Sequence, residues 1–174
     1  MSKVILYIAT SLDDCIARTN GDVSWLFTDQ DYGYSEFYQS VDTIIMGRNT
    51  YDHVCSFGDY PYKKVKSYIL THHKETLDRL PPNSETYAGD IAQLIEHAKR
   101  EAEKNIWVVG GAHVSQECLN KGLVDELWLF IHPIILGSGL RLYEHIEKEI
   151  PLTLRHAKRY ETGLVQLIYS IAHP

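Results

Sequence analysis

One junction in this sequence places anion-binding groups directly after an apolar run. Residues 44–51 read IIMGRNTY, so a buried strand would lead through Gly47 to Arg48 and Thr50 at the start of a helix. The glycine lets a ligand approach the backbone, the guanidinium offers a bidentate fork, and the hydroxyl lies beside free helix N–H groups. The pattern indicates a phosphate site. A surface arginine beside an ordinary capping threonine is the alternative that such a short motif leaves open.

A second junction follows the apolar residues 105–109, where Gly110 and Gly111 precede Ala112 and His113. Two successive glycines between a strand and a helix let a diphosphate come close to the backbone at the positive helix end. The spacing is not G-x-G-x-x-G, so the fingerprint of the dinucleotide-binding fold is missing. A tight turn without a ligand is the alternative interpretation.

Two further segments carry polar groups where predicted strands end. Residues 137–139 form a Gly-Ser-Gly loop that either offers N–H donors to a ligand or simply makes a turn. Thr71 follows another apolar run and precedes His72 and His73. Adjacent residues of an extended chain point to opposite sides, and the sequence offers no third ligand at suitable spacing, so no metal site is predicted.

The usual catalytic motifs are missing from the sequence. There is no G-x-S-x-G elbow of a serine hydrolase and no Walker loop of a nucleoside triphosphatase. Cys15, Cys55 and Cys118 form no C-x-x-C pair, which argues against a structural zinc site. Chemistry supplied by a bound cofactor is therefore the better enzyme hypothesis.

The elements that must position these groups alternate along the chain. Strands are predicted at residues 4–9, 42–46, 65–70, 84–87, 105–109, 126–133, 152–159 and 164–172. Helices are predicted at residues 35–40, 49–55, 91–102 and 113–121, with Asp90 capping the third and Gly122 ending the fourth. Alternation predicts a mostly parallel sheet, and the short turn at 161–163 predicts an antiparallel C-terminal edge. The expectation is one α/β domain spanning residues 1–174.

Composition limits the classes of partner. The chain has 174 residues and a formal net charge of −6, which argues against a general binder of nucleic acid or membrane surfaces, because attraction to phosphate needs a basic face. The N-terminal apolar run is too short for a signal peptide. The longest apolar stretch, residues 127–136, is interrupted by His132 and Pro133 and cannot span a bilayer. A reduced cytoplasmic protein acting on a small molecule is expected.

Taken in order, five segments resemble the dihydrofolate reductase superfamily. The closer resemblance is to its bacterial branch, which is similar to the C-terminal reductase domain of the bifunctional riboflavin biosynthesis protein. The segments are residues 10–13 with 16–17, 46–51, 69–71, 109–112 and 133–139. The resemblance implies a three-layer α/β fold with a central sheet of about eight strands. It also implies an NADPH-dependent reductase that transfers a hydride to a pterin-like or aminouracil-ribose substrate.

The resemblance also implies site residues by position. The cofactor residues would be Ala9, Gly47, Arg48, Thr50, Thr71, His72, Gly110, Gly111, Ala112 and His113, with Arg48 near the extra phosphate of NADPH. The substrate residues would be Ser11, Gly137, Ser138 and Gly139. Asp13 is the first candidate for orienting the substrate, and Glu36 or Asp31 for the acid that supplies a proton. Each of these carboxylates has an ordinary surface or capping role as its alternative.

The first loop departs from the pattern of this branch. The branch usually reads Ser-Leu-Asp-Gly, whereas Asp14 follows Asp13 in this chain. Dihydrofolate reductases carry a Trp-x-x-Pro stretch, whereas Trp25 is followed here by residues 26–28 without a proline. Three alternatives therefore stay open: a dihydrofolate or other pterin reductase, a nucleotide-binding protein without efficient turnover, and a scaffold that binds neither ligand.

A surplus of apolar residues on one predicted strand bears on oligomeric state. The residues are Trp128, Phe130, Ile131 and Ile134. They exceed what one face of a small sheet needs to bury, and exposed apolar surface of this kind is typical of subunit interfaces. A homodimer is predicted on this ground.

Overall fold

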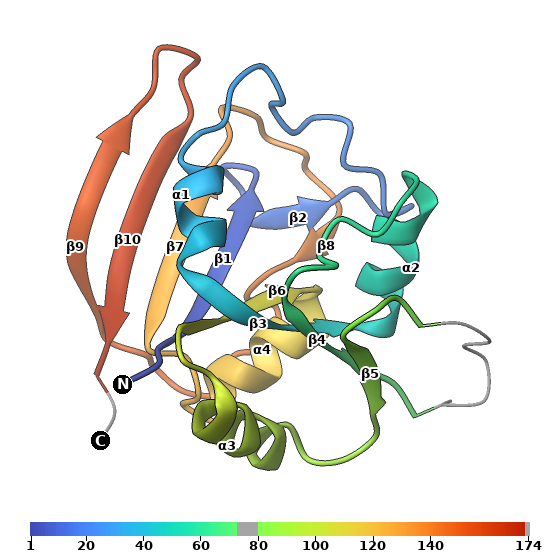
Figure 1. The fold of residues 1–174 in the computed structure, drawn as a ribbon. Helices are drawn as coiled ribbons and strands as arrows, with labels where there is room; N and C mark the ends of the chain where they lie inside the picture. The colour runs from blue at the N-terminus through green and yellow to red at the C-terminus, as the bar shows by residue number, and fades with distance from the viewer. Residues whose placement is uncertain (73–79, 173–174) are drawn as a thin grey trace.

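The computed structural model, which describes residues 1–72 and 80–172, has a large sheet with helices on both faces (Figure 1). The strands of this sheet are β1 Val4–Thr10, β3 Val41–Gly47, β4 Lys66–Leu70, β5 Ser84–Tyr87, β6 Asn105–Gly110, β7 Glu126–Ile131, β9 Leu152–Arg159 and β10 Val165–Ile171. The helices are α1 Tyr34–Gln39, α2 Arg48–Ser56, α3 Ile91–Glu101 and α4 Ala112–Asn120. The eight strands lie in the order β5-β4-β3-β6-β1-β7-β10-β9.

Strand directions follow the expected α/β pattern. Every neighbouring pair from β5 to β7 is parallel, whereas β10 pairs antiparallel with both β7 and β9. The turn between β9 and β10 contains Gly163 at a φ of +89°, a left-handed conformation that glycine adopts without steric cost. The prediction of a mostly parallel sheet with an antiparallel C-terminal edge is confirmed.

Two hydrophobic clusters hold the helices to the sheet. On one face, α3 and α4 pack through side chains such as Leu94 and Cys118 against Leu6 and Val108. On the other face, α1 and α2 pack around Phe37, Tyr51, Ile44 and Trp107. The central strands are therefore buried from both sides, which explains why their sequences read as continuous apolar runs.

The helix boundaries follow from local chemistry that the sequence displays. The Asp90 carboxylate accepts hydrogen bonds from the N–H groups of Ala92 at 2.8 Å and Gln93 at 3.3 Å, as an N-cap should. Gly122 follows the last turn of α4 at a φ of +63°, the left-handed conformation predicted there.

Two short strands were not predicted. β2 Cys15–Ala17 and β8 Leu140–Arg141 form a separate two-stranded sheet within regions that we expected to be loops. Strands of two or three residues are too short to show the alternation by which strands are identified in a sequence. We predicted a polar loop at residues 10–21, and β2 shows that this prediction was wrong in part.

The apolar residues behind the homodimer prediction lie mostly inside the fold. Phe130 is 4% exposed and packs in a small cluster with Tyr32 and Leu164. Trp128 and Ile131 are partly buried against the core clusters of the two faces. These contacts account for Trp128, Phe130 and Ile131, and the homodimer stays a prediction.

Candidate functional site

The predicted cofactor residues gather where parallel strands end. Thr71 directly follows β4, Gly47 ends β3 and Gly110 ends β6, and these three strands are neighbours in the sheet. Thr10 ends β1, which lies beside β6. Because the four strands are parallel, their carboxyl ends share one edge with the N-termini of α2 and α4. Ligands of open α/β sheets bind at such an edge.

Gly47 and Gly111 bring the two helix N-termini close together. A Cβ at Gly47 would lie 3.1 Å from Cγ2 of Val114 in α4, and a Cβ at Gly111 would lie 3.3 Å from Oγ1 of Thr50 in α2. The N-cap of each helix is a glycine, so no cap side chain covers either helix start. Two helix starts that meet at glycines suit a diphosphate, because the anion can come close to the backbone.

The two adjacent glycines differ in backbone conformation. Gly110 has a φ of +117°, which favours glycine, whereas Gly111 has a φ of −74° that any residue adopts. The peptide bond between them is cis. The need for glycine therefore differs at the two positions: at Gly110 it is conformational, and at Gly111 it is a matter of space.

Arg48 lies at the start of α2 as predicted. Its Nε is 2.8 Å from both carboxylate oxygens of Asp52, one helical turn later, and about a quarter of its side chain is exposed (26%). We call the sheet edge at which β4, β3, β6 and β1 end the cofactor edge, after the residues predicted there. The ion pair fixes the direction of the guanidinium at this edge. A phosphate bound there would meet a cation that is already oriented.

The remaining predicted cofactor residues lie around the same edge. Thr71 is buried and donates its backbone N–H to the carbonyl of Tyr87 at 2.9 Å. His72 and His113 are exposed. His73 lies outside the described residues, and within residues 1–72 and 80–172 no group of three or more His, Cys, Asp or Glu side chains is arranged to hold a metal ion.

Asp13 fastens two loops to each other. Its carboxylate accepts hydrogen bonds from the Ser11 hydroxyl at 2.6 Å and from the backbone N–H groups of Leu136 at 3.0 Å and Gly137 at 2.7 Å. The Ser11 hydroxyl and the Leu136 N–H lower the pKa of Asp13 to about 2. The carboxylate is therefore ionised at neutral pH and engaged with its own chain, which favours a role in shaping the loop.

The glycine-rich loop at residues 137–139 packs closely against β2 at Gly139. A Cβ at Gly139 would lie 2.4 Å from the carbonyl oxygen of Ala17 in β2, so only glycine fits between the two short strands. Gly137 has a φ of +77° and open space around it, and Ser138 is exposed. There is room beside Gly137 and Ser138, although the Gly137 N–H is donated to Asp13, and the role of both residues in substrate binding stays a prediction.

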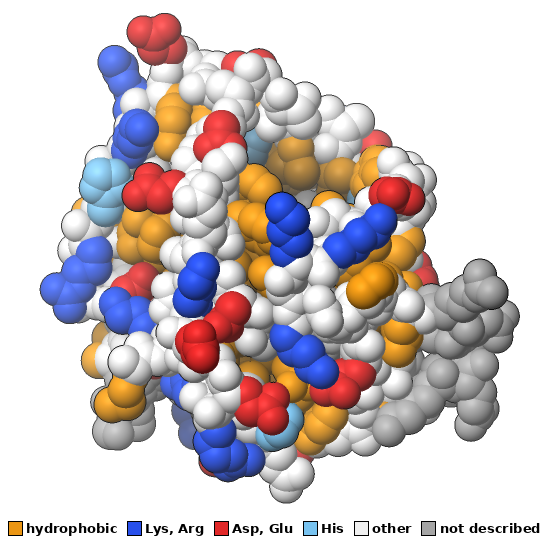
Figure 2. All heavy atoms as spheres, viewed as in Figure 1, with side chains coloured by type: hydrophobic (Ala, Val, Ile, Leu, Met, Phe, Trp, Pro, Cys, Tyr) orange, Lys and Arg blue, Asp and Glu red, His pale blue; other side chains and the backbone are white. Residues whose placement is uncertain are grey.

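A pocket of about 440 Å³ opens beside the cofactor edge. Its walls come from β1, β7 and the segment before α1, and aromatic rings dominate them. The lining residues are Tyr7, Ala9, Leu26, Phe27, Thr28, Gln30, Asp31, Tyr32, Tyr34, Phe130, His132 and Leu164. Figure 2 shows hydrophobic side chains in a hollow on this face of the molecule. We call this site the aromatic pocket.

The three predicted carboxylates hold different positions relative to the aromatic pocket. Asp31 lines it, whereas Asp13 and Glu36 do not. The hydroxyl and backbone N–H of Ser35 donate to Asp31 at 2.7 and 3.1 Å and hold the pKa of this carboxyl below its usual value. Asp31 is thus ionised at neutral pH and suits hydrogen-bond acceptance better than proton donation.

Tyr7 and His132 are among the titratable residues of the aromatic pocket that were not predicted. Burial raises the pKa of Tyr7, so its phenol keeps its proton at neutral pH. His132 is 4% exposed; its Nε2 accepts a hydrogen bond from the Phe27 N–H at 3.2 Å, and its Nδ1 lies 3.3 Å from the Phe130 carbonyl oxygen. Burial also lowers the pKa of His132, so a neutral imidazole anchors the segment before α1.

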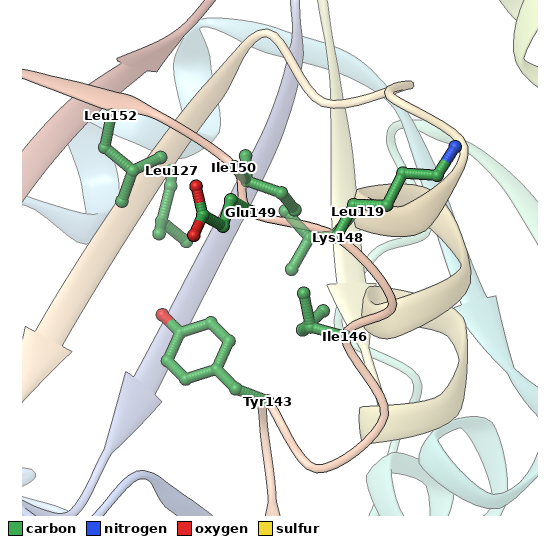
Figure 3. A pocket seen from close by; sticks show the side chains of 8 residues that line it. All are labelled: Leu119, Leu127, Tyr143, Ile146, Lys148, Glu149, Ile150 and Leu152. Carbon is green, nitrogen blue, oxygen red and sulfur yellow. The ribbon is translucent and has the colours of Figure 1, made fainter.

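A second cavity lies apart from this edge. It has a volume of about 260 Å³, and its lining includes Leu119 at the end of α4, Leu127 near the start of β7 and the segment around Ile146 and Ile150 (Figure 3). Because Leu127 lies near the amino end of its strand, this cavity is at the opposite end of the strands from the cofactor edge. It takes no part in the candidate site.

Comparison with known proteins assigns the family. A sequence model of the RibD C-terminal domain matches residues 2–166. The chain belongs to this family. It is 36% identical over 172 residues to the uncharacterized protein YwjB of Bacillus subtilis (strain 168), covering 96% of this chain and 97% of the relative. It is 31% identical over 179 residues to the uncharacterized protein YyaP of the same organism, covering 96% and 94%.

Solved structures show the same fold. A putative riboflavin biosynthesis protein from Shewanella sp. PV-4 superposes with a TM-score of 0.85 at 26% identity, covering 98% of this chain and 99% of that one. A diaminohydroxyphosphoribosylaminopyrimidine deaminase/5-amino-6-(5-phosphoribosylamino)uracil reductase from Thermotoga maritima superposes with a TM-score of 0.74 at 16% identity, covering 98% of this chain and 57% of that one. The predicted resemblance to the riboflavin reductase domain is confirmed at the level of family and fold.

Membership of the RibD C-terminal family fits the position of the predicted residues at one sheet edge. What the sequence analysis missed is the aromatic pocket beside them, including Tyr7, Phe130 and His132. A usable signal existed in part. Tyr7 interrupts an otherwise aliphatic run, and Phe130 and His132 are two residues apart at the end of β7, so their side chains share one face.

No helix in the described part of this chain has the length and apolarity to cross a membrane.

Proposed function

We propose that the protein is an NADPH-dependent reductase that transfers a hydride to a pterin-like or aminouracil-ribose ring held in the aromatic pocket. One observation carries the proposal: the helix N-termini at Gly47 and Gly111 meet at the same sheet edge that leads, past Ala9 on the neighbouring strand, into this pocket. A diphosphate platform and a pocket for a flat ring are the two parts that such a reductase needs.

The residues at the cofactor edge fit a dinucleotide phosphate. At Gly47 and Gly111 the absence of a side chain lets an anion approach the backbone at both helix starts. Gly47, Gly110 and Gly111 would hold the diphosphate, and Arg48 and Thr50 the adenosine end. Bound NADPH would supply the hydride.

The chain's own contribution to the reaction is orientation and charge. The rings of Tyr7, Phe27 and Phe130 would hold a flat ligand, and the ionised Asp31 would accept a hydrogen bond from a ring N–H. The phenol of Tyr7, which keeps its proton, would donate a hydrogen bond to the atom that gains electron density. The proton that completes the reduction would come from solvent, which reaches the pocket past its exposed rim.

Cofactor titration followed by turnover assays tests the proposal. We expect NADPH to bind more tightly than NADH, and NADPH to be oxidised in the presence of a pterin or an aminouracil riboside. Tight NADPH binding without oxidation by any member of these two classes would favour a nucleotide-binding protein instead. A protein that binds neither dinucleotide would refute the proposal.

A further inference from the structure

The opening of the aromatic pocket differs in character from its interior. The interior is formed by buried or half-buried side chains, among them Tyr7, Tyr32 and Phe130. Thr28, Gln30 and Asp31 line the same pocket but are exposed to solvent, so they form its rim. A ring inside the pocket must direct its substituents past this rim.

The rim carries negative charge. Asp31 is held ionised by hydrogen bonds from the hydroxyl and the backbone N–H of Ser35. Asp29, also exposed, lies next to the rim and accepts a hydrogen bond from the Tyr32 hydroxyl at 2.7 Å. Among the lining residues in the described part of the chain, none is Lys or Arg. The groups that a substituent would meet are carboxylates, amides and hydroxyls.

We propose that the aromatic pocket selects a planar nitrogen heterocycle whose substituents carry no phosphate. The inference rests on the proposed function and names the substrate class of the same site. It separates this chain from the Thermotoga maritima protein, whose name specifies a phosphoribosyl substrate.

Electrostatics at the rim supports the selection. A phosphate monoester near neutral pH carries close to two negative charges, and it would lie beside two carboxylates with no guanidinium or ammonium among the lining residues to neutralise it. Aromatic ring faces add no attraction, because their quadrupole is negative on the face. An uncharged ribose hydroxyl instead finds hydrogen-bond partners in Gln30 and Thr28.

A matched ligand pair tests the proposal directly. We would titrate the full-length protein, without cofactor, with 5-amino-6-(ribosylamino)uracil and with its 5′-phosphate, using calorimetry. The expected result is that the unphosphorylated compound binds at least about tenfold more tightly. Equal affinities, tighter binding of the phosphate, or no binding of either compound would overturn the proposal.

A charge placed at the rim gives a second measurement on the same pair. Gln30→Lys puts an ammonium beside the opening, and we expect it to improve the relative affinity for the phosphate by about tenfold. The matched control is Gln93→Lys, the same substitution at an exposed position of α3, on the opposite face of the sheet. An equal change in both variants would mean that net charge, not the rim, sets the ratio.

Failure of this inference and failure of the proposed function give different results. The ligand pair is titrated without cofactor, so its affinity ratio does not depend on dinucleotide binding. Absence of NADPH binding would refute the reductase and leave the ratio measurable. A preference for the phosphorylated compound in a protein that binds NADPH would refute only the inference about substrate class.

Discussion

An ion pair with Arg141 holds Asp14, whose backbone has a left-handed conformation that is usual for glycine. Asp14 has a φ of +63°, and its Oδ1 lies 2.6 Å from Nη1 of Arg141, which also donates to the Asp13 carbonyl oxygen at 2.9 Å. The RibD-like pattern has glycine at this position, and aspartate is among the few other residues that tolerate the left-handed region. The loop therefore keeps the shape that glycine allows. In addition, an ion pair joins the residue before β2 to the last residue of β8.

Comparison of Asp14→Gly with Asp14→Ala should isolate the backbone cost at this position. Both variants lose the ion pair with Arg141, but only alanine must place a Cβ in the left-handed region. We expect Asp14→Ala to have a free energy of unfolding about 1 kcal/mol lower than that of Asp14→Gly. Urea denaturation of the two variants measures this difference. Equal stabilities would show that the φ at residue 14 is not fixed in solution.

Asp13 should make the stability of the protein depend on acid pH. Its pKa is about 2 in the folded protein and 3.8 as its ordinary value. A carboxyl whose pKa is lowered by folding contributes stability above its unfolded pKa, and this contribution is lost as the pH falls from about 3.8 to about 2. Asp13→Asn should therefore be less stable than wild type near neutral pH, and the difference should shrink across that window.

Urea midpoints of wild type and Asp13→Asn, measured from neutral pH down to about pH 2, test this dependence. Glu36→Gln is the control, because Glu36 is an exposed carboxylate on α1 outside the loop contacts of Asp13. A stability difference between wild type and Asp13→Asn that stays constant across the whole range would contradict the prediction.

The strands and helices of the main sheet could be predicted because their sequence signals are local. β5 Ser84–Tyr87 and β9 Leu152–Arg159 lie where they were predicted, and the Asp90 cap is visible in the spacing of residues. β2 and β8 could not be predicted, because their pairing depends on the missing side chain of Gly139 against Ala17, a contact between distant parts of the chain.

The candidate site divides in the same way. The cofactor edge was predictable, since each glycine junction is continuous in sequence and parallel strands end on one side of the sheet. The aromatic pocket was not, because Tyr7, Phe27 and Phe130 come from three separate segments that meet only in the folded chain. No regular spacing of these three residues in the sequence indicates that they contact the same pocket.

Arg48 should give a preference for NADPH over NADH. Its guanidinium, oriented by Asp52, can make charge-assisted hydrogen bonds to the extra ribose phosphate that NADH lacks. We expect Arg48→Ala to weaken NADPH binding by about 1.5–3 kcal/mol, or about one to two orders of magnitude in Kd, with NADH affinity nearly unchanged. Calorimetric titration with both cofactors measures the effect.

The control for Arg48→Ala is Arg100→Ala, which removes an exposed cation from α3, the helix on the other face of the sheet. That variant should bind both cofactors like wild type. Equal losses of NADPH and NADH affinity in Arg48→Ala would show that the residue supports the fold of α2 instead of reading the phosphate.

Alanine substitutions at the two adjacent glycines should separate stability from cofactor binding. At Gly110, with a φ of +117°, alanine would be strained, and we expect a loss of unfolding free energy of about 1–3 kcal/mol. At Gly111, with a φ of −74°, the backbone accepts alanine, and the new Cβ would lie 3.3 Å from Thr50 Oγ1, so a shift of a few tenths of an ångström suffices.

Gly111→Ala, and more severely Gly111→Val, should therefore fold near-normally and lose affinity for both NADPH and NADH, because the added side chain occupies the space between the helix N-termini where the diphosphate would lie. Thermal unfolding and cofactor titration are measured on the same samples. If folded Gly111→Val binds NADPH as tightly as wild type, the diphosphate lies elsewhere and Gly111 only turns the chain from β6 into α4.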